Sequence, residues 1–103
     1  MAHYLITSLF KPTDALRSNS DDLQQRSDTV SRELKSQISN VKFGDSYALL
    51  DSNETIDFVE ADNESDVEKA VEIIRTYGKV QATFTPIISW HDLLVRLKQP
   101  ANH

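Results

Sequence analysis

The sequence predicts a small α+β domain built on one antiparallel sheet, and three features of the chain lead to that prediction. Four segments alternate their side chains as β-strands do. Three further segments carry apolar residues at helical spacing. Glycine, proline and short polar residues mark the boundaries, most clearly around the stretch from Thr55 to Ile88. At 103 residues, the chain from 1 to 103 is expected to be a single domain.

Composition narrows the class of protein. Apolar residues make up 39% of the chain, which is too hydrophobic for a disordered protein. The lack of cysteine excludes disulfide bonds, thiolate nucleophiles and cysteine metal ligands. The net charge is −5, and residues 51–72 hold nine acidic side chains against Lys69 alone. We interpret this acidic run as a solvated surface, and the alternative is a surface for divalent cations.

Charge and hydropathy also bear on partners and location. The acidic chain lacks the clustered lysine and arginine that bind phosphate backbones, so we expect no nucleic-acid partner. No run approaches the roughly 20 apolar residues of a membrane-spanning helix, so we expect no membrane association. The N-terminal stretch lacks a basic leader and a small-residue cleavage site, which favours a cytoplasmic location.

The first predicted strand, His3 to Phe10, carries large apolar side chains on both alternations, and Pro12 closes it. A strand with two apolar faces is covered on both sides, so it should lie centrally in its sheet. A helix is predicted from Asp21 to Gln37, with Ser27 at the polar step of its inward stripe. The apolar members of that stripe are Leu23, Val30, Leu34 and Ile38.

The second predicted strand, Val41 to Leu50, is interrupted by Gly44 and Asp45, a pair that indicates a bulge or bend. Its alternation is expected to place the larger side chains on one side, namely Val41, Phe43, Tyr47 and Leu49. The polar residues Asp51 to Glu54 predict a hairpin turn that leads into the third strand, Thr55 to Ala61.

The second helix has the clearest boundary signals. Ser65 and Glu68 form an S-x-x-E capping box, and Gly78 stands where a left-handed residue is expected to end the helix. The inward stripe comprises Val67, Ala70, Val71, Ile74 and Tyr77. The fourth strand, Lys79 to Ile88, should lie at a sheet edge because Pro86 cannot donate to a ladder.

A last helix is predicted to begin at Ser89, with Asp92 as its capping partner. The element order is then β-α-β-β-α-β plus a C-terminal helix, the ferredoxin-like pattern with a four-stranded antiparallel sheet. In that pattern the first strand lies between the third and fourth strands, and two helices cover one face. Apolar side chains on the other face predict that it meets a second sheet.

The chain resembles the GYD-domain family. The similarity lies in the Val-Glu-Ala-Asp of residues 59–62, in the helix that ends at Gly78, and in the Lys-Val-Gln-Ala-Thr-Phe-Thr-Pro-Ile-Ile of residues 79–88. It covers roughly Tyr4 to Ile88. Where the family carries its Gly-Tyr-Asp signature, this chain reads Asp51-Ser52-Asn53-Glu54.

This resemblance implies a dimeric α+β barrel, in which the sheets of two copies pack face to face as a homodimer. It also implies a cavity between sheet and helices or between the two sheets. It implies no settled activity, since the wider superfamily includes cofactor-free monooxygenases, lactone isomerases, haem-handling proteins and amino-acid-sensing modules.

Asp57 is the first candidate for a functional residue. It is a carboxylate in the middle of a strand, flanked by Ile56 and Phe58, and burial there would raise its pKa toward that of a general base. The alternative is an ordinary aspartate that faces solvent or forms an ion pair between subunits. The sequence predicts that Asp57 projects from the open sheet face.

A polar row on the fourth strand is the second candidate. Gln81, Thr83 and Thr85 share one alternation, and Thr7 or Ser8 of the first strand would join them as hydrogen-bonding groups for a ligand. The alternative is an edge-strand surface or a polar seam of the dimer. We therefore take the candidate ligand-binding residues to be His3, Thr7, Asp57, Gln81, Thr83 and Thr85.

The histidines give no metal motif. His3 is expected at one end of the first strand, where it can reach a cavity, His91 in the first turn of the last helix, and His103 at the terminus. No metal-ligand spacing such as HExxH occurs, so we expect no metal site and no cofactor.

Two functions remain open. The first is a non-catalytic, homodimeric module that binds a small organic ligand or regulates a partner. The second is a cofactor-free enzyme of the monooxygenase or isomerase type, with Asp57 and His3 as acid or base. A closed apolar pocket of at least ~300 Å³ that contains Asp57 would favour the enzyme. A purely structural dimer is a third possibility.

Overall fold

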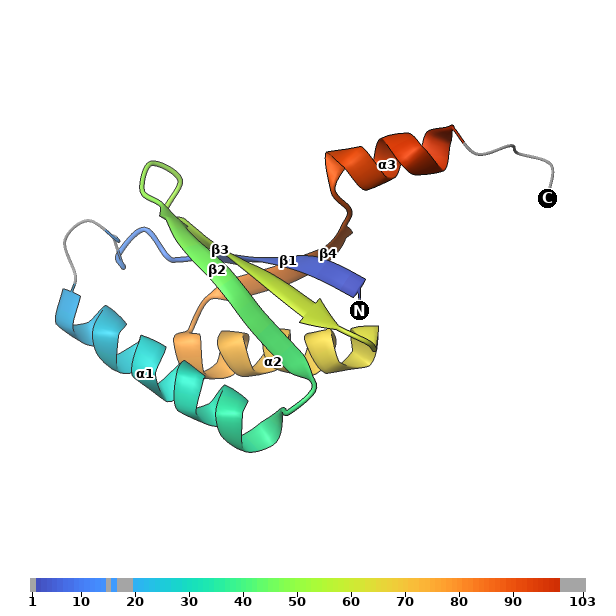
Figure 1. Ribbon diagram of the computed structural model, residues 1–103. Coiled ribbons are helices and arrows are strands. Elements are labelled where there is room, and N and C mark those ends of the chain that lie inside the picture. The colour runs from blue at the N-terminus through green and yellow to red at the C-terminus, as the bar shows by residue number, and fades with distance from the viewer. Residues whose placement is uncertain (1, 15, 17–19, 99–103) are drawn as a thin grey trace.

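The computed structural model of the chain describes residues 2–14, 16 and 20–98 and arranges them as one sheet with helices (Figure 1). The elements are β1 (Ala2–Leu9), α1 (Ser20–Gln37), β2 (Val41–Leu49), β3 (Glu54–Ala61), α2 (Glu64–Gly78), β4 (Gln81–Ile87) and α3 (Trp90–Leu97). The predicted α+β, ferredoxin-like order with a C-terminal helix is confirmed.

The sheet is antiparallel throughout, in the order β2-β3-β1-β4. β1 lies between β3 and β4, as its two apolar faces predicted, and Ile6 pairs with Asp57 on one side and Phe84 on the other. Among the described strands, β4 pairs only with β1, so Pro86 lies on an edge strand as predicted.

The core forms where α2 packs on the sheet. Val67, Val71 and Ile74 of α2 meet the inner side chains of the three strands β1, β3 and β4. Those strand residues are Tyr4, Ile6, Val59, Ala61 and Ala82. Full burial of a valine or isoleucine side chain stabilises the fold by about 1.5–3 kcal/mol, so α2 contributes much of the stability.

The boundaries of α2 correct two details of the sequence analysis. The helix begins at Glu64 with Asn63 as its N-cap, and the cap has no side-chain hydrogen bond, so the Ser65–Glu68 capping box was a wrong prediction. The left-handed residue is Lys79 (φ 56°), and its N–H donates to the carbonyl of Arg75 at 3.1 Å. Gly78 is the last helical residue instead.

A register shift between Phe43 and Ser46 confirms the predicted bulge at Gly44 and Asp45. The shift also overturns the predicted alternation of β2. Phe43 pairs with Val59 and shares its helix-facing side, whereas Tyr47 pairs with Ile56 on the opposite side. One inserted residue is enough to exchange the faces of a strand.

The second face of the sheet is left open, because α1 and α2 both lie on the other side (Figure 1). Its apolar side chains are Leu5, Leu9, Tyr47, Leu49, Ile56, Phe58 and Ile87. The rings of Tyr47 and Phe58 meet edge to face with centroids 6.4 Å apart.

Among the described helices, none combines the length and apolarity that crossing a bilayer requires.

Candidate functional site

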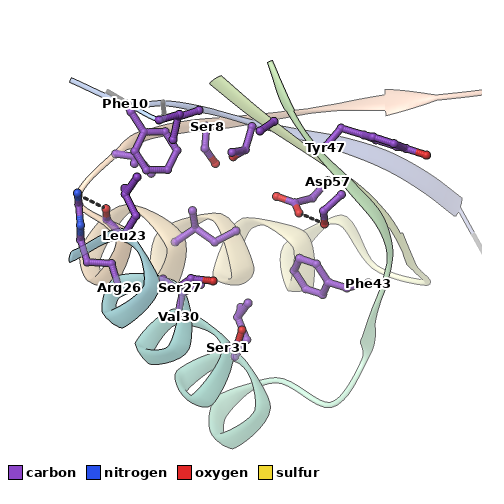
Figure 2. Close-up of a pocket in the computed structure, with 18 of the residues that line it drawn as sticks. Ser8, Phe10, Leu23, Arg26, Ser27, Val30, Ser31, Phe43, Tyr47 and Asp57 are labelled. Carbon is purple, nitrogen blue, oxygen red and sulfur yellow. Dashed lines mark hydrogen bonds between the residues drawn. The ribbon is translucent and has the colours of Figure 1, made fainter. Parts of the chain in front are cut away.

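A cavity of about 590 Å³ separates α1 from the sheet (Figure 2). Apolar side chains line most of it, among them Phe10, Leu23, Val30, Leu34, Phe43 and Val80. The cavity exists because α1 packs along α2 rather than directly on the strands. Apart from Phe43, many of the strand residues opposite α1 are small or polar and do not fill the space; they include Ser46, Ala48 and Thr55.

The cavity is open on the side of β2. Ser31 and Lys35 of α1 and Phe43 of β2 border this opening, and all three are exposed. Tyr47 also belongs to the wall, but its side chain points away from the cavity (Figure 2). The cavity is therefore only partly enclosed. Its volume exceeds the ~300 Å³ that we expected of an enzyme pocket, but it does not meet the second condition, that the pocket be closed.

Asp57 projects from β3 into this cavity (Figure 2). Its oxygen Oδ1 accepts a hydrogen bond from the hydroxyl of Ser46 on the neighbouring strand β2. Burial raises the pKa of Asp57, and the Ser46 hydrogen bond lowers that pKa to a smaller extent. The group is thus a carboxyl that takes up a proton more readily than an aspartate in water.

Ser46 reaches Asp57 because of the bulge in β2. The pairing resumes after the shift with Ser46 opposite Asp57, which points both side chains to the helix side. Without the extra residue at Gly44 or Asp45, the strand alternation would turn Ser46 away. The bulge thus positions the one hydrogen-bond donor that Asp57 has among the described residues.

Arg26 of α1 closes the end of the cavity near Phe10. Its side chain is only 9% exposed. Nη1 donates to the carbonyl of Gly78 at 3.1 Å, and Nη2 lies 3.3 Å from Asp14 and 2.9 Å from Asp22. The guanidinium also lies over the Phe10 ring, 6.0 Å from its centroid.

These contacts give Arg26 a structural explanation. It joins α1 to the end of α2 and to the segment after β1, and its charge is balanced by two carboxylates. Its Nε has no hydrogen-bond partner among the described residues. Between Leu23 and Val30, the buried residue of α1 is Arg26, whereas Ser27 is exposed. The burial of Arg26 was not predicted from the sequence.

The other candidate residues lie on the opposite face from Asp57. Thr7 pairs with Thr83, and both belong to the open face. The side chains of Gln81 and Thr85 are on the same alternation as Thr83 and are exposed. The structure therefore separates Asp57 from the polar row, and the prediction that they share the open face was wrong.

His3 also lies on the open face, where its Nε2 is 2.9 Å from Oε1 of Glu60. It does not line the α1 cavity, so His3 and Asp57 cannot act on one molecule bound there. Ser8, buried on β1, takes a place in the cavity wall instead. His91 is exposed on α3, and His103 lies outside the described residues.

Metal ligation receives no support from the described part of the chain. Within residues 2–14, 16 and 20–98, no three side chains of histidine, aspartate or glutamate lie close enough to hold an ion. Arg26 and Ser46 are the site residues that sequence reasoning did not find, whereas a cavity between sheet and helices was one of the two alternatives that the family resemblance implied. The one usable signal was an arginine at the inward spacing between Leu23 and Val30.

Comparison with known proteins agrees with this architecture. The family model described as "GYD domain" matches residues 4–95, and it does so although the Gly-Tyr-Asp signature reads Asp51-Ser52-Asn53-Glu54 here. No curated protein matched the chain. Because the family match spans most of the sequence, the chain belongs to the GYD-domain family, within the dimeric α+β barrel superfamily.

Proposed function

We propose that this chain is a non-catalytic, homodimeric module that binds a small organic molecule in the cavity between α1 and the sheet. The observation that carries the proposal is a largely apolar cavity of about 590 Å³ with the half-buried carboxyl of Asp57 in its wall. Sites for small molecules are typically concave, mostly apolar and ~300–1,000 Å³ in volume, with a few polar groups that fix orientation.

The chemistry of the wall indicates the class of ligand. Leu23, Leu34 and Phe43 offer apolar surface, which favours a compact hydrophobic body. The Ser46 hydroxyl donates a hydrogen bond to Oδ1 of Asp57, whereas Oδ2 has no hydrogen-bond partner among the described residues. A ligand hydroxyl or amine can donate to Oδ2, and the expected ligand is thus a largely apolar molecule with one such group.

The binding site is tested first by native mass spectrometry of freshly purified protein. We expect a small molecule to travel with the wild type and to be lost from Ser31→Trp, whose indole would fill the cavity mouth. Ser36→Trp is the matched control, because Ser36 is exposed on the same helix but does not line the cavity. Equal occupancy in both variants would contradict the proposed site.

The dimer part of the proposal rests on the open face of the sheet. Tyr47, Leu49 and Phe58 remain exposed there, and a second sheet would cover them. Membership of a superfamily of dimeric barrels supports the same arrangement. Light scattering on the purified protein tests it, and a strict monomer at micromolar concentration would contradict it.

The second candidate function is a cofactor-free enzyme that uses Asp57 as a base. The raised pKa of Asp57 favours this candidate, because a general base works best when its pKa lies near the operating pH. A base that removes a proton from carbon would exchange that position with solvent. Deuterium uptake from D₂O by the co-purified molecule, present with wild type and absent with Asp57→Asn, would select the enzyme over the binding module.

A further inference from the structure

The C-terminal helix α3 stands apart from the rest of the chain. It leaves the end of β4 and lies on the side of the sheet opposite to α1 and α2 (Figure 1). None of its eight residues is buried. The start of the helix is nevertheless well defined, because the Ser89 hydroxyl accepts a hydrogen bond from the N–H of Asp92 at 3.0 Å as an N-cap.

One face of α3 is apolar. Trp90, Leu94 and Leu97 follow one another at spacings of four and three, which aligns them on a single stripe. Trp90 is 72% exposed and Leu97 is 69% exposed. A tryptophan and leucines so exposed on a formed helix are unusual for a chain that acts as a monomer.

This stripe continues the apolar surface of the sheet. Ile87 ends β4 on the open face, exposed Ile88 follows, and Trp90 begins α3. The two uncovered surfaces thus lie on the same side of the molecule and are joined by only two residues, Ile88 and Ser89. A partner that covers the open face would meet α3 as well.

We propose that α3 is an arm that docks on a second copy of this chain, with Trp90 and Leu97 as its anchors. This extends the face-to-face dimer proposed above from the sheets to the helix. Four strands about 4.8 Å apart and about eight residues long give the sheet a footprint of roughly 500 Å². A standard interface takes roughly 800 Å² from each partner, which sheet and arm together reach more readily than the sheet alone.

Charge favours the same occupant. Arg96 and Lys98 at the end of α3 form no ion pair with the described part of their own chain. The open face of a second copy carries the carboxylates of Glu54 and Glu60 on β3. The cationic end of the arm is therefore complementary to acidic side chains on the face that it would meet.

The single tryptophan of the chain makes the proposal measurable, because all indole fluorescence comes from Trp90. Sedimentation and Trp90 emission are followed together over a dilution series of the full chain. We expect emission to shift to shorter wavelength as dimer forms. Leu97→Gln should weaken dimerisation by about tenfold to a hundredfold, the range that burial of one leucine represents.

Val95→Gln is the matched control. Val95 is exposed on the same helix but lies on the face opposite to the stripe, so this variant should dimerise as the wild type does. Equal dissociation constants for the two variants, with Trp90 emission unchanged on dimerisation, would overturn the arm and leave a dimer of sheets. Blue-shifted emission from a monomer would overturn the proposal, because Trp90 would then be covered by its own chain. Blue-shifted emission from monomeric protein bound to lipid vesicles would overturn it in favour of a lipid surface.

Discussion

The Ser46 hydroxyl on β2 donates a hydrogen bond to Oδ1 of Asp57 on β3, and the bulge at Gly44 and Asp45 makes this contact possible. The pair contributes a carboxyl and a hydroxyl to a largely apolar cavity wall. Its consequences for proton affinity, stability and ligand binding can each be measured separately.

Ser46→Ala should raise the pKa of Asp57 above its value in the wild type. The hydroxyl stabilises the ionised carboxylate, so its removal leaves the effect of burial unopposed. An NMR titration of the Asp57 side-chain carboxyl carbon measures the pKa directly. Ser31→Ala is the control, because Ser31 lines the cavity without a hydrogen bond to Asp57. An unchanged or lowered pKa in Ser46→Ala would disprove the assigned role.

Asp57→Asn should change the pH dependence of stability. Because burial raises the pKa of Asp57, the folded protein holds this proton more tightly than the unfolded chain does. The stabilisation is fully present below the unfolded pKa of about 3.8 and is lost as pH rises through the folded pKa.

The stability of Asp57→Asn relative to wild type should therefore increase as pH rises from 3 to neutral. Urea denaturation of both proteins across that range provides the comparison. A difference in unfolding free energy that stays constant with pH would refute the raised pKa.

Arg26→Met should destabilise the protein by roughly 3 kcal/mol, because it leaves the partly buried Asp14 without its cation. The carbonyl of Gly78 also loses its guanidinium donor. Arg32→Met on the exposed side of α1 serves as the control and should change stability by less than about 0.5 kcal/mol. Thermal or urea unfolding gives both values, and similar small effects would mean that Arg26 does not hold α1 in place.

Gly78→Ala should be neutral or stabilising by up to about 1 kcal/mol, since alanine is the better helix former. A Cβ at this position would lie 3.5 Å from Val30 and 3.6 Å from Val80, which are ordinary contacts. The left-handed residue is Lys79, so Lys79→Gly should also stabilise. A loss of 1 kcal/mol or more in Gly78→Ala would instead restore the left-handed assignment made from the sequence.

The order of elements could be predicted from the sequence because it depends on local signals. Pro86 indicated an edge strand, the two apolar faces of β1 indicated a central one, and Ser89 indicated the start of α3. The ends of α2 were harder to predict. Ser65 and Gly78 suit their expected places, but the N-cap is Asn63, two residues before Ser65, and the left-handed residue is Lys79, one residue after Gly78.

The candidate site could be predicted only in part. A carboxylate in the middle of β3 was visible as unusual, and Asp57 does line the cavity. Its face was mispredicted, because the sequence did not define which alternation of β3 packs inward. The cavity itself depends on how far α1 stands from β2, a distance between elements that no local pattern encodes. The role of Arg26 was likewise not encoded in a local pattern, because its partners Asp14 and Gly78 come from separate parts of the chain.

The central claim is that Asp57 recognises a hydrogen-bond donor on an apolar molecule within the cavity. The most direct test is isothermal titration of wild type and Asp57→Leu with 2-naphthol and with naphthalene, which lacks the hydroxyl. We expect wild type to prefer 2-naphthol by about tenfold to a hundredfold, as a hydrogen bond to a charged group allows, and Asp57→Leu to lose that preference. Equal affinities of wild type for the two probes, or a preference that survives in Asp57→Leu, would contradict the account.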